Sequence, residues 1–315
     1  MLKIKPIYND AYQCYQSVCA SIARFYNRNY ELAFLSSWNF IYKNIAEEKF
    51  GNRIIIKEKI EFIELLDFFY GIEIIRLNEF FNQKKHDIIK NELLQQRPVL
   101  IYTDTYYCNW CRFYLKQHFQ HIILALGNYN EHTIVCIDPY FSNKHIMVDL
   151  DCFREIQWDI GVVHLKQPKS SLNMLEQLID IVLYSAVEDG IRIFEYIDMF
   201  VQDFEKDFCI LKEFKGENNI KEAPIFNVLQ KARKNTLSFA EALSCVSETY
   251  DSKIQDIVVI VKEIASMWSQ FTNVLVKMYL TNNKGLKINA IQILKIIVKK
   301  EKAVWDGLMY VKSKL

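Results

Sequence analysis

The sequence lacks the long apolar runs of membrane proteins. No run reaches the roughly 18 apolar residues that a membrane-spanning helix needs. The first residues, MLKIKPIYNDAYQC, contain no apolar stretch of the kind found in signal peptides. We therefore expect no membrane segment, no export and a cytoplasmic location.

An excess of one charge is also missing. The chain has 39 Lys and Arg residues against 38 Asp and Glu residues, a formal net charge of +1, and like charges form no long block. Nucleic-acid-binding surfaces are usually strongly basic, so the sequence predicts no nucleic-acid partner. The 8 cysteines are irregularly spaced and lie mostly in apolar segments, which favours reduced thiols over a disulfide framework.

Apolar residues, in contrast, are abundant. Hydrophobic residues make up 51% and aromatic residues 14% of the 315-residue chain, which is ample for a globular protein and more than one core usually holds. The residue pattern changes near the segment LKQPKSSLN. We therefore predict a first domain over residues 1–167 and a second domain over residues 168–315.

The first domain is predicted to have an α+β fold. Helical periodicity dominates its beginning and alternating apolar strands dominate its end, as in helices packed on an antiparallel sheet. The expected helices span about 14–25, 32–41, 60–69, 78–96 and 152–157, and the expected strands are EIIRL, VLIYTD, HIILALG, TIVCID, HIMVDL and GVVHL.

The second domain is predicted to be all-α. Long stretches of helical periodicity, such as IQDIVVIVKEIASMWSQF and INAIQILKIIVKK, indicate a bundle of about five helices. The apolar run IVVIV within this domain is flanked by charged residues and is too short to cross a bilayer. We assign that run to the core of the bundle.

Cys14 is the first candidate for chemistry. It shares a helix face with Val18 and Ile22, which places it in the first turn of the predicted helix. The unpaired amides and the positive end of the helix dipole at that position favour a thiolate. The alternative is that Cys14 only begins a buried apolar stripe, since free cysteines are often core residues.

His121 and Asp138 lie on two predicted strands that are joined by a short turn. If NYNE forms that turn, His121 faces Asp138 directly across the hairpin, on the same side of the sheet. A carboxylate beside an imidazole fixes its tautomer and stabilises the imidazolium, which a base acting on a thiol requires. With Cys14 these residues form a candidate triad for nucleophilic acyl transfer. The alternative is an ordinary hairpin that ends in an Asp-Pro turn.

These motifs resemble those of a known family. The order QC…ARFYN, a D-x-YY segment, H-x-x-HIILALGNY and VCIDPY is similar to the papain-like cysteine domain of the acyltransferase of butirosin biosynthesis. It is more distantly similar to leader peptidases of bacteriocin exporters. The resemblance covers about residues 6–165. It implies a papain-like cysteine-peptidase fold, followed by an all-α domain that covers the cleft or docks a carrier protein.

The resemblance also implies an activity. Cys14 would be the nucleophile, His121 the base and Asp138 the residue that orients the base. Members of this family take an acyl group from a carrier-protein thioester and pass it to an amine, such as a diamine, a polyamine or an aminoglycoside, in natural-product biosynthesis. The implied partners are an acyl or peptidyl carrier protein and a small amine. The acyl group is carried on the phosphopantetheine of the carrier protein, and no cofactor of the enzyme itself is implied.

The oxyanion donor is an open point in the sequence. Papain-like enzymes usually carry a glutamine about six residues before the nucleophile, where its amide stabilises the oxyanion. Tyr8 occupies that position here, with Asn9 and Gln13 nearby. The candidates for the oxyanion donor are therefore Tyr8, Asn9 and Gln13.

The aromatic segment DTYYCNWCRFY is a candidate wall for the substrate site. Asp104 is expected to hold a second ammonium group of a polyamine, and Tyr106, Tyr107 and Trp110 are expected to exclude water. The alternative for Asp104 is an ordinary strand end beside packed tyrosines.

Three alternatives to the acyltransferase remain. Zinc is one, because Cys108, Cys111, His118 and His121 form a C-x2-C-x6-H-x2-H pattern, but its spacing is shorter than that of common zinc fingers and we predict no metal site. The second is a cysteine peptidase or amidase with the same triad. The third is a binding module that keeps the fold without catalysis.

Overall fold

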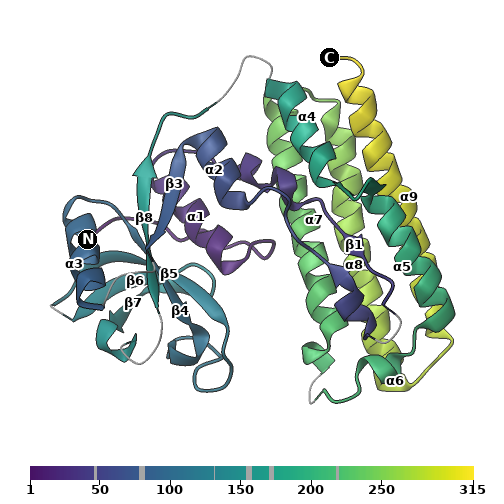
Figure 1. The fold of residues 1–315 in the computed structure, drawn as a ribbon, viewed down its shortest axis with the longest axis horizontal. Coiled ribbons are helices and arrows are strands. Elements are labelled where there is room, and N and C mark those ends of the chain that lie inside the picture. The colour runs from purple at the N-terminus through teal and green to yellow at the C-terminus, as the bar shows by residue number, and fades with distance from the viewer. Residues whose placement is uncertain (46–47, 78–81, 131, 154–157, 170–173, 218–219) are drawn as a thin grey trace. The chain divides into compact units, whose positions relative to one another are not determined.

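The computed structural model describes residues 1–45, 48–77, 82–130, 132–153, 158–169, 174–217 and 220–315. The chain is mixed α+β and divides into two compact units, which are described separately (Figure 1). Unit 1 comprises Met1–Tyr30 and Ile63–Ser170, and unit 2 comprises Glu31–Phe62 and Ser171–Leu315.

Unit 1 is built on a six-stranded antiparallel sheet. The strand order is β3-β8-β4-β5-β6-β7. The central strands are continuous apolar runs because they are buried on both faces. The strands are β3 (Ile72–Leu77), β4 (Val99–Asp104), β5 (Gln120–Asn128), β6 (Thr133–Asp138), β7 (Ser142–Asp149) and β8 (Asp159–Leu165).

In the described part of unit 1, three α-helices and two short 3-10 helices accompany this sheet. Among the packed pairs, α1 contacts β5, and α3 contacts β4, β5 and β8. The elements are α1 (Cys14–Phe25), α2 (Phe62–Tyr70), α3 (Asn82–Leu94), η3 (Thr105–Tyr107) and η4 (Leu150–Phe153). The predicted bounds of the first helix are confirmed. It ends just before Asn27, which adopts a left-handed φ of 54°.

Other helix predictions for this domain need correction. Of the predicted helix at 152–157, Cys152 and Phe153 belong to the 3-10 helix η4, and residues 154–157 lie outside the described residues. The predicted helix at 78–96 is observed only over α3, and residues 78–81 also lie outside the described residues.

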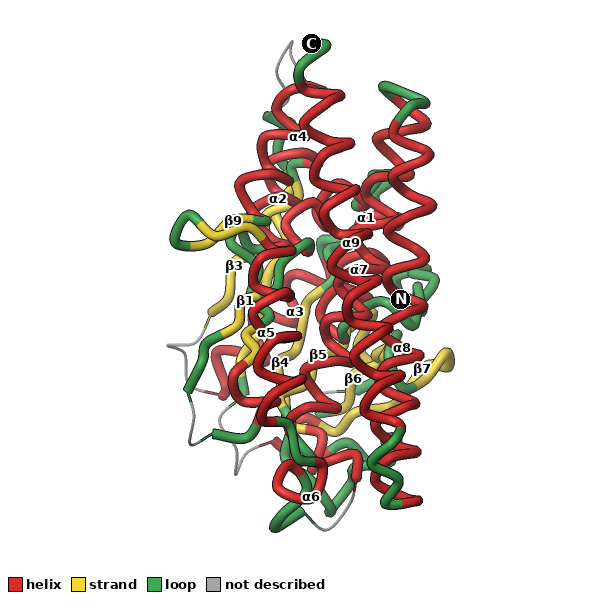
Figure 2. Tube along the Cα trace, turned by 90° about the vertical axis from the view of Figure 1, so that its right-hand side faces the viewer, coloured by secondary structure: helices red, strands yellow, loops and turns green. Residues whose placement is uncertain are grey.

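Unit 2 consists mainly of helices. The long helices α7, α8 and α9 run beside one another, with α8 packed between the other two (Figures 1 and 2). The helices are α4 (Met174–Ser185), α5 (Ile193–Asp207), α6 (Ile210–Glu213), α7 (Pro224–Thr249), α8 (Ile254–Thr281) and α9 (Leu286–Lys312), with the 3-10 helices η1 (Glu31–Ser37), η2 (Phe50–Arg53) and η5 (Ile220–Glu222). None of the described helices is long and apolar enough to cross a bilayer.

Two short ribbons show that unit 2 is not purely helical. They are formed by β1 (Ile41–Tyr42) with β2 (Ile54–Ile55), and by β9 (Val187–Glu188) with β10 (Ile191–Arg192). The second ribbon turns through Asp189 and Gly190, whose φ values of 52° and 79° are those of a type I′ turn. Gly190 therefore makes the turn of a hairpin here.

Residues 31–62 belong to unit 2, although the predicted boundary at residue 167 placed them in the first domain. Their aromatic side chains pack into the helical core. The Trp38 ring stacks on Phe239 of α7 at 5.3 Å, and the Phe40 ring stacks on Trp268 of α8 at 5.6 Å. These contacts join residues that are far apart in the sequence, so helical periodicity alone does not predict them.

A buried carboxyl group lies in the core of this unit. Glu301 of α9 is 2% exposed, and its Oε2 accepts a 2.6 Å hydrogen bond from Nε1 of Trp38. Burial raises the pKa of Glu301 to about 7, although the Trp38 hydrogen bond acts in the opposite direction. The folded protein therefore retains this proton over a pH range in which an unfolded chain releases it.

We expect a Glu301→Gln substitution to change the pH dependence of stability. The folded pKa lies above the ordinary value of 4.5, so the stability that Glu301 confers is lost as pH rises from about 4.5 to about 7. Glutamine still accepts from Trp38 but cannot ionise. We expect the variant to be more stable than the wild type above pH 7, by about 3 kcal/mol at most.

Urea unfolding at pH 5 and pH 8 measures this effect. The control is Glu263→Gln on α8, where the side chain is 51% exposed and pairs with Lys300. A gain for Glu301→Gln that is equal at both pH values would contradict the assignment.

Candidate active site

Three chain segments of unit 1 bring Cys14, His121 and Asp138 together. Cys14 is the first residue of α1, His121 is the second residue of β5, and Asp138 is the last residue of β6. Nε2 of His121 lies 2.7 Å from Oδ2 of Asp138, and the Cys14 side chain lies close enough to the imidazole to raise the pKa of His121. Because Nε2 is engaged by Asp138, Nδ1 is the ring nitrogen left for the sulfur.

The predicted register of the hairpin is wrong by two residues, yet the two side chains meet. In the structure Ala125 pairs with Cys136 and Leu124 pairs with Ile137. This register makes His121 and Asp138 diagonal neighbours and not direct partners. A shift of two residues is one full period of the side-chain alternation, so both residues remain on one side of the hairpin.

The register error arises at the turn. There Asn128 pairs with Ile134, three residues away from the predicted register, and a bulge in β5 between Ala125 and Gly127 reduces the difference to two. Neither feature can be seen in the alternation of apolar residues.

Asp138 is fully buried, and four donors surround its carboxylate. Oδ2 accepts from Nε2 of His121 and, at 2.8 Å, from Nε1 of Trp110. Oδ1 accepts from the backbone amides of Tyr140 at 3.0 Å and Phe141 at 3.1 Å. Burial opposes ionisation, but the hydrogen bond and charge of His121 outweigh it, so the pKa of Asp138 is lowered. The group therefore remains a carboxylate.

The environment of His121 favours its charged form. The side chain is 2% exposed, and this burial lowers the pKa. The hydrogen bonds and charges of Asp138 and Cys14 act more strongly and raise the pKa of His121 to about 9. At neutral pH the ring is therefore an imidazolium, with the Cys14 side chain beside it.

The segment before α1 holds Cys14 at the beginning of the helix. The side-chain oxygen of Asn9 accepts from the amide of Ala11 at 2.9 Å, and the Asn9 carbonyl accepts from the amide of Tyr12 at 2.9 Å. The backbone amide of Gln13 donates to Oε1 of Gln16 at 2.9 Å, which caps the helix. Cys14 is partly exposed, so substrate can reach its sulfur.

The three oxyanion candidates lie near this helix start, in different settings. Tyr8 is 62% exposed, and its hydroxyl donates to Asp10 at 2.5 Å. The side chain of Asn9 caps the turn described above. Gln13 is exposed and directly precedes Cys14.

The predicted substrate wall divides into two groups in the structure. Oδ1 of Asp104 accepts from the amide of Tyr106 at 2.8 Å, and Oδ2 lies 3.0 Å from Nδ1 of His118. The His118 ring stacks on Tyr106 at 4.2 Å, and Tyr107 meets Tyr106 edge-on at 5.2 Å. Asp104 is thus engaged by residues of its own loop.

Trp110 lies against the triad and not in the group around Asp104. Sequence reasoning assigned it to the wall and did not foresee its bond to Asp138. A sequence feature that could have indicated this contact is the position of Trp110 between Cys108 and Cys111, in the loop that leads to the strand carrying His121. The thiols of these cysteines lie 3.4 Å from the carbonyl oxygens of Asp104 and Thr105, respectively.

The residues of the zinc alternative are engaged elsewhere. Cys108 and Cys111 contact backbone carbonyls, His118 pairs with Asp104, and His121 pairs with Asp138. Within the part of the chain that the structure describes, no group of three or more His, Cys, Asp and Glu side chains could hold a metal ion.

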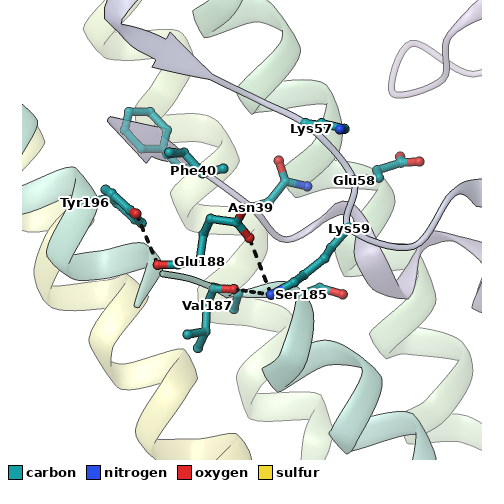
Figure 3. Close-up of a pocket in the computed structure, with 11 residues that line it drawn as sticks. Asn39, Phe40, Lys57, Glu58, Lys59, Ser185, Val187, Glu188 and Tyr196 are labelled. Carbon is teal, nitrogen blue, oxygen red and sulfur yellow. Dashed lines mark hydrogen bonds and ion pairs between the residues drawn. The ribbon is translucent and has the colours of Figure 1, made fainter. Parts of the chain in front are cut away.

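A separate cavity of about 140 Å³ lies within unit 2 (Figure 3). Its polar groups largely satisfy one another. Nζ of Lys59 donates to the carbonyl of Val187 at 2.8 Å and pairs with Glu188 at 3.4 Å, and the Tyr196 hydroxyl donates to the carbonyl of Glu188 at 3.1 Å. Among the described residues that line this cavity, no nucleophile is paired with a base, so the candidate active site is the one in unit 1.

No protein-family model matches the chain, and no curated protein is significantly similar to it.

Proposed function

We propose that this protein is a papain-like cysteine acyltransferase that forms amides. The observation that carries the proposal is the convergence of three side chains: Nε2 of His121 lies 2.7 Å from Oδ2 of the buried Asp138, and the Cys14 side chain lies close enough to the imidazole to raise its pKa. A partly exposed thiol at a helix N-terminus beside an imidazolium is the arrangement that thiol acyl transfer needs. The resemblance to the acyltransferase of butirosin biosynthesis supports the same class.

In the first step the Cys14 thiolate attacks the carbonyl carbon of a carrier-bound thioester. A carbon–sulfur bond forms to Cys14, and the bond to the pantetheine sulfur breaks. His121, which is an imidazolium at neutral pH, gives its proton to the departing thiolate. One thioester replaces another, so this step is nearly balanced in energy.

In the second step an amine attacks the acyl group on Cys14. A carbon–nitrogen bond forms, the bond to Cys14 breaks, and the neutral His121 takes the proton that the amine loses. Asp138 stabilises the imidazolium that results. The thiolate and imidazolium are thereby restored, and formation of an amide from a thioester drives the sequence forward.

We assign the oxyanion site to the first turn of α1. The backbone amide of Cys14 lies where the helix leaves amides without intrahelical acceptors. Gln13 is the best placed of the three side-chain candidates, because it is exposed and adjacent to the sulfur. All three residues take part in local hydrogen bonds, Gln13 through the capping box that it forms with Gln16, so exposure and position distinguish them.

Product analysis tests the proposal. The protein is incubated with a benzoyl-pantetheine thioester and an excess of a primary amine, and the products are separated by mass. We expect benzoyl amide from the wild type and none above background from Cys14→Ala. Cys245→Ala, which removes a partly exposed thiol of unit 2, serves as the matched control and should retain the product.

Other products would identify the alternatives. Benzoic acid in place of the amide, lost in Cys14→Ala, would show a hydrolase with the same triad. Consumption of no thioester, together with no acyl group on Cys14, would contradict both enzymes and favour a binding module.

A further inference from the structure

A strip of four aromatic side chains adjoins the triad. We call Phe113, Phe119, Tyr140 and Phe141 the aromatic strip. Phe113 contacts Phe119 with ring centroids 5.2 Å apart and Phe141 with centroids 5.9 Å apart, and Phe141 contacts Tyr140 at 4.9 Å. Phe119 is 51% exposed and the other three are half-buried, so the strip offers a continuous apolar surface to a ligand.

The strip lies against the imidazole. The ring of Phe141 is 4.9 Å from the ring of His121, and the ring of Tyr140 is 6.4 Å from it. In the proposed reaction His121 gives a proton to the departing thiol and then takes one from the amine, so both groups must reach the imidazole. The body of the amine therefore extends along the surface beside His121.

The charges beside the strip oppose a second ammonium group. The guanidinium of Arg112 lies 4.8 Å from the ring centroid of Phe113, and no ion pair to Arg112 is present among the described residues. The carboxylates near the strip already accept hydrogen bonds. Asp138 accepts four, Asp104 binds Tyr106 and His118, and Asp10 accepts from the hydroxyl of Tyr8, which lies near Tyr140. A dicationic polyamine would therefore meet the charge of Arg112, while these carboxylates are already bound by donors of the protein.

We propose that the aromatic strip is the acceptor subsite and that it selects primary amines with an apolar body and no second positive charge. This inference rests on the proposed acyl transfer to an amine. An arylalkyl or alkyl monoamine stacks its body on the strip and points its nitrogen at the acyl group on Cys14. A polyamine or an aminoglycoside is a poorer acceptor, because its charged or hydroxylated body gains little on an apolar surface.

The test measures the reaction of the amine separately from the acylation of Cys14. The benzoyl enzyme is formed first and confirmed by intact mass, and its decay is then followed after an amine is added. Phenethylamine and ethanolamine are compared at equal concentrations of free base, as are propylamine and 1,3-diaminopropane. We expect phenethylamine to react at least about tenfold faster than ethanolamine. We expect 1,3-diaminopropane to react about threefold more slowly per amino group than propylamine.

Two substitutions, Phe119→Ala and Arg112→Gln, test which residues produce the preference among amines. Phe119→Ala removes the exposed end of the strip without touching His121, and it should reduce the advantage of phenethylamine several-fold while benzoylation is unchanged. Tyr129→Ala, which removes a 68% exposed aromatic residue in the β5–β6 loop, is the control and should leave the advantage intact. Arg112→Gln should bring the diamine closer to propylamine.

The outcomes distinguish failure of the proposed function from failure of the acceptor assignment. Failure to form any benzoyl enzyme would overturn the proposed function itself. A benzoyl enzyme that reacts with all four amines alike, or fastest with the diamine, would overturn the acceptor assignment and leave the acyltransferase standing.

Discussion

Replacing His121 with glutamine is expected to slow acylation of Cys14 by on the order of 10³-fold or more. Glutamine cannot carry the positive charge that favours the thiolate, and it cannot give a proton to the departing thiol. The buried Asp138 would also lose the partner that keeps its negative charge favourable. The loss should appear in the acylation rate even at a saturating concentration of donor.

The rate of benzoyl-enzyme formation, followed by intact mass, measures this loss. His164→Gln is the matched control, because His164 is a half-exposed histidine on β8 that pairs with Glu73 at 3.7 Å. It should acylate at the wild-type rate. Equal rates for His121→Gln and the wild type would remove His121 from the mechanism.

The same residue sets the pH dependence of the wild type. Because the pKa of His121 is raised to about 9, the imidazolium persists through neutral pH and is lost only as pH rises through about 9. The acylation rate should therefore fall above pH 9 in the wild type. His121 should also stabilise the fold below about pH 6.5, with this contribution lost as pH rises to about 9, because its folded pKa exceeds its ordinary value.

Asp138→Asn is expected to cost nearly as much as the loss of the base, on the order of 10³- to 10⁴-fold in rate. Both oxygens of Asp138 accept two hydrogen bonds each, from His121 and Trp110 on one side and from two backbone amides on the other. An asparagine amide group must point its own hydrogens at one of these pairs of donors. If it faces His121, it favours the tautomer with a hydrogen on Nδ1, which cannot take the thiol proton.

If the asparagine instead faces the backbone amides, both amides lose their acceptor, and the free energy of unfolding should fall more than in the first orientation, where only Trp110 loses its acceptor. The expected cost is about 1–3 kcal/mol for each buried donor left without an acceptor. Acylation rate and urea unfolding are measured together to separate the two orientations. Asp87→Asn, an exposed carboxylate on α3, is the control. A variant with the wild-type rate and stability would show that the carboxylate is not required.

Sequence reasoning predicted the elements that carry the triad because those signals are local. The bounds of α1 follow from its apolar periodicity and from Asn27 just beyond its end, and the strands of His121 and Asp138 follow from continuous apolar runs. These features place Cys14 at a helix start and the other two residues near strand ends.

The remaining features depend on contacts that a linear pattern does not contain. The bulge between Ala125 and Gly127 changes the register without changing the apolar alternation. Trp38 belongs to the helical unit because its ring stacks on Phe239, some 200 residues later in the chain. Trp110 donates a hydrogen bond to Asp138 because its loop brings it beside that carboxylate, whereas its residue type alone suggests only a hydrophobic wall.

The most direct test of the central claim is the mass of the protein after brief exposure to benzoyl-pantetheine without an amine, followed by digestion and peptide mapping. The account predicts one benzoyl group on the peptide that contains Cys14. The group should be released by neutral hydroxylamine, as a thioester is, and should be absent in Cys14→Ala. A benzoyl group that persists in Cys14→Ala, or that maps to any other cysteine, would contradict the account.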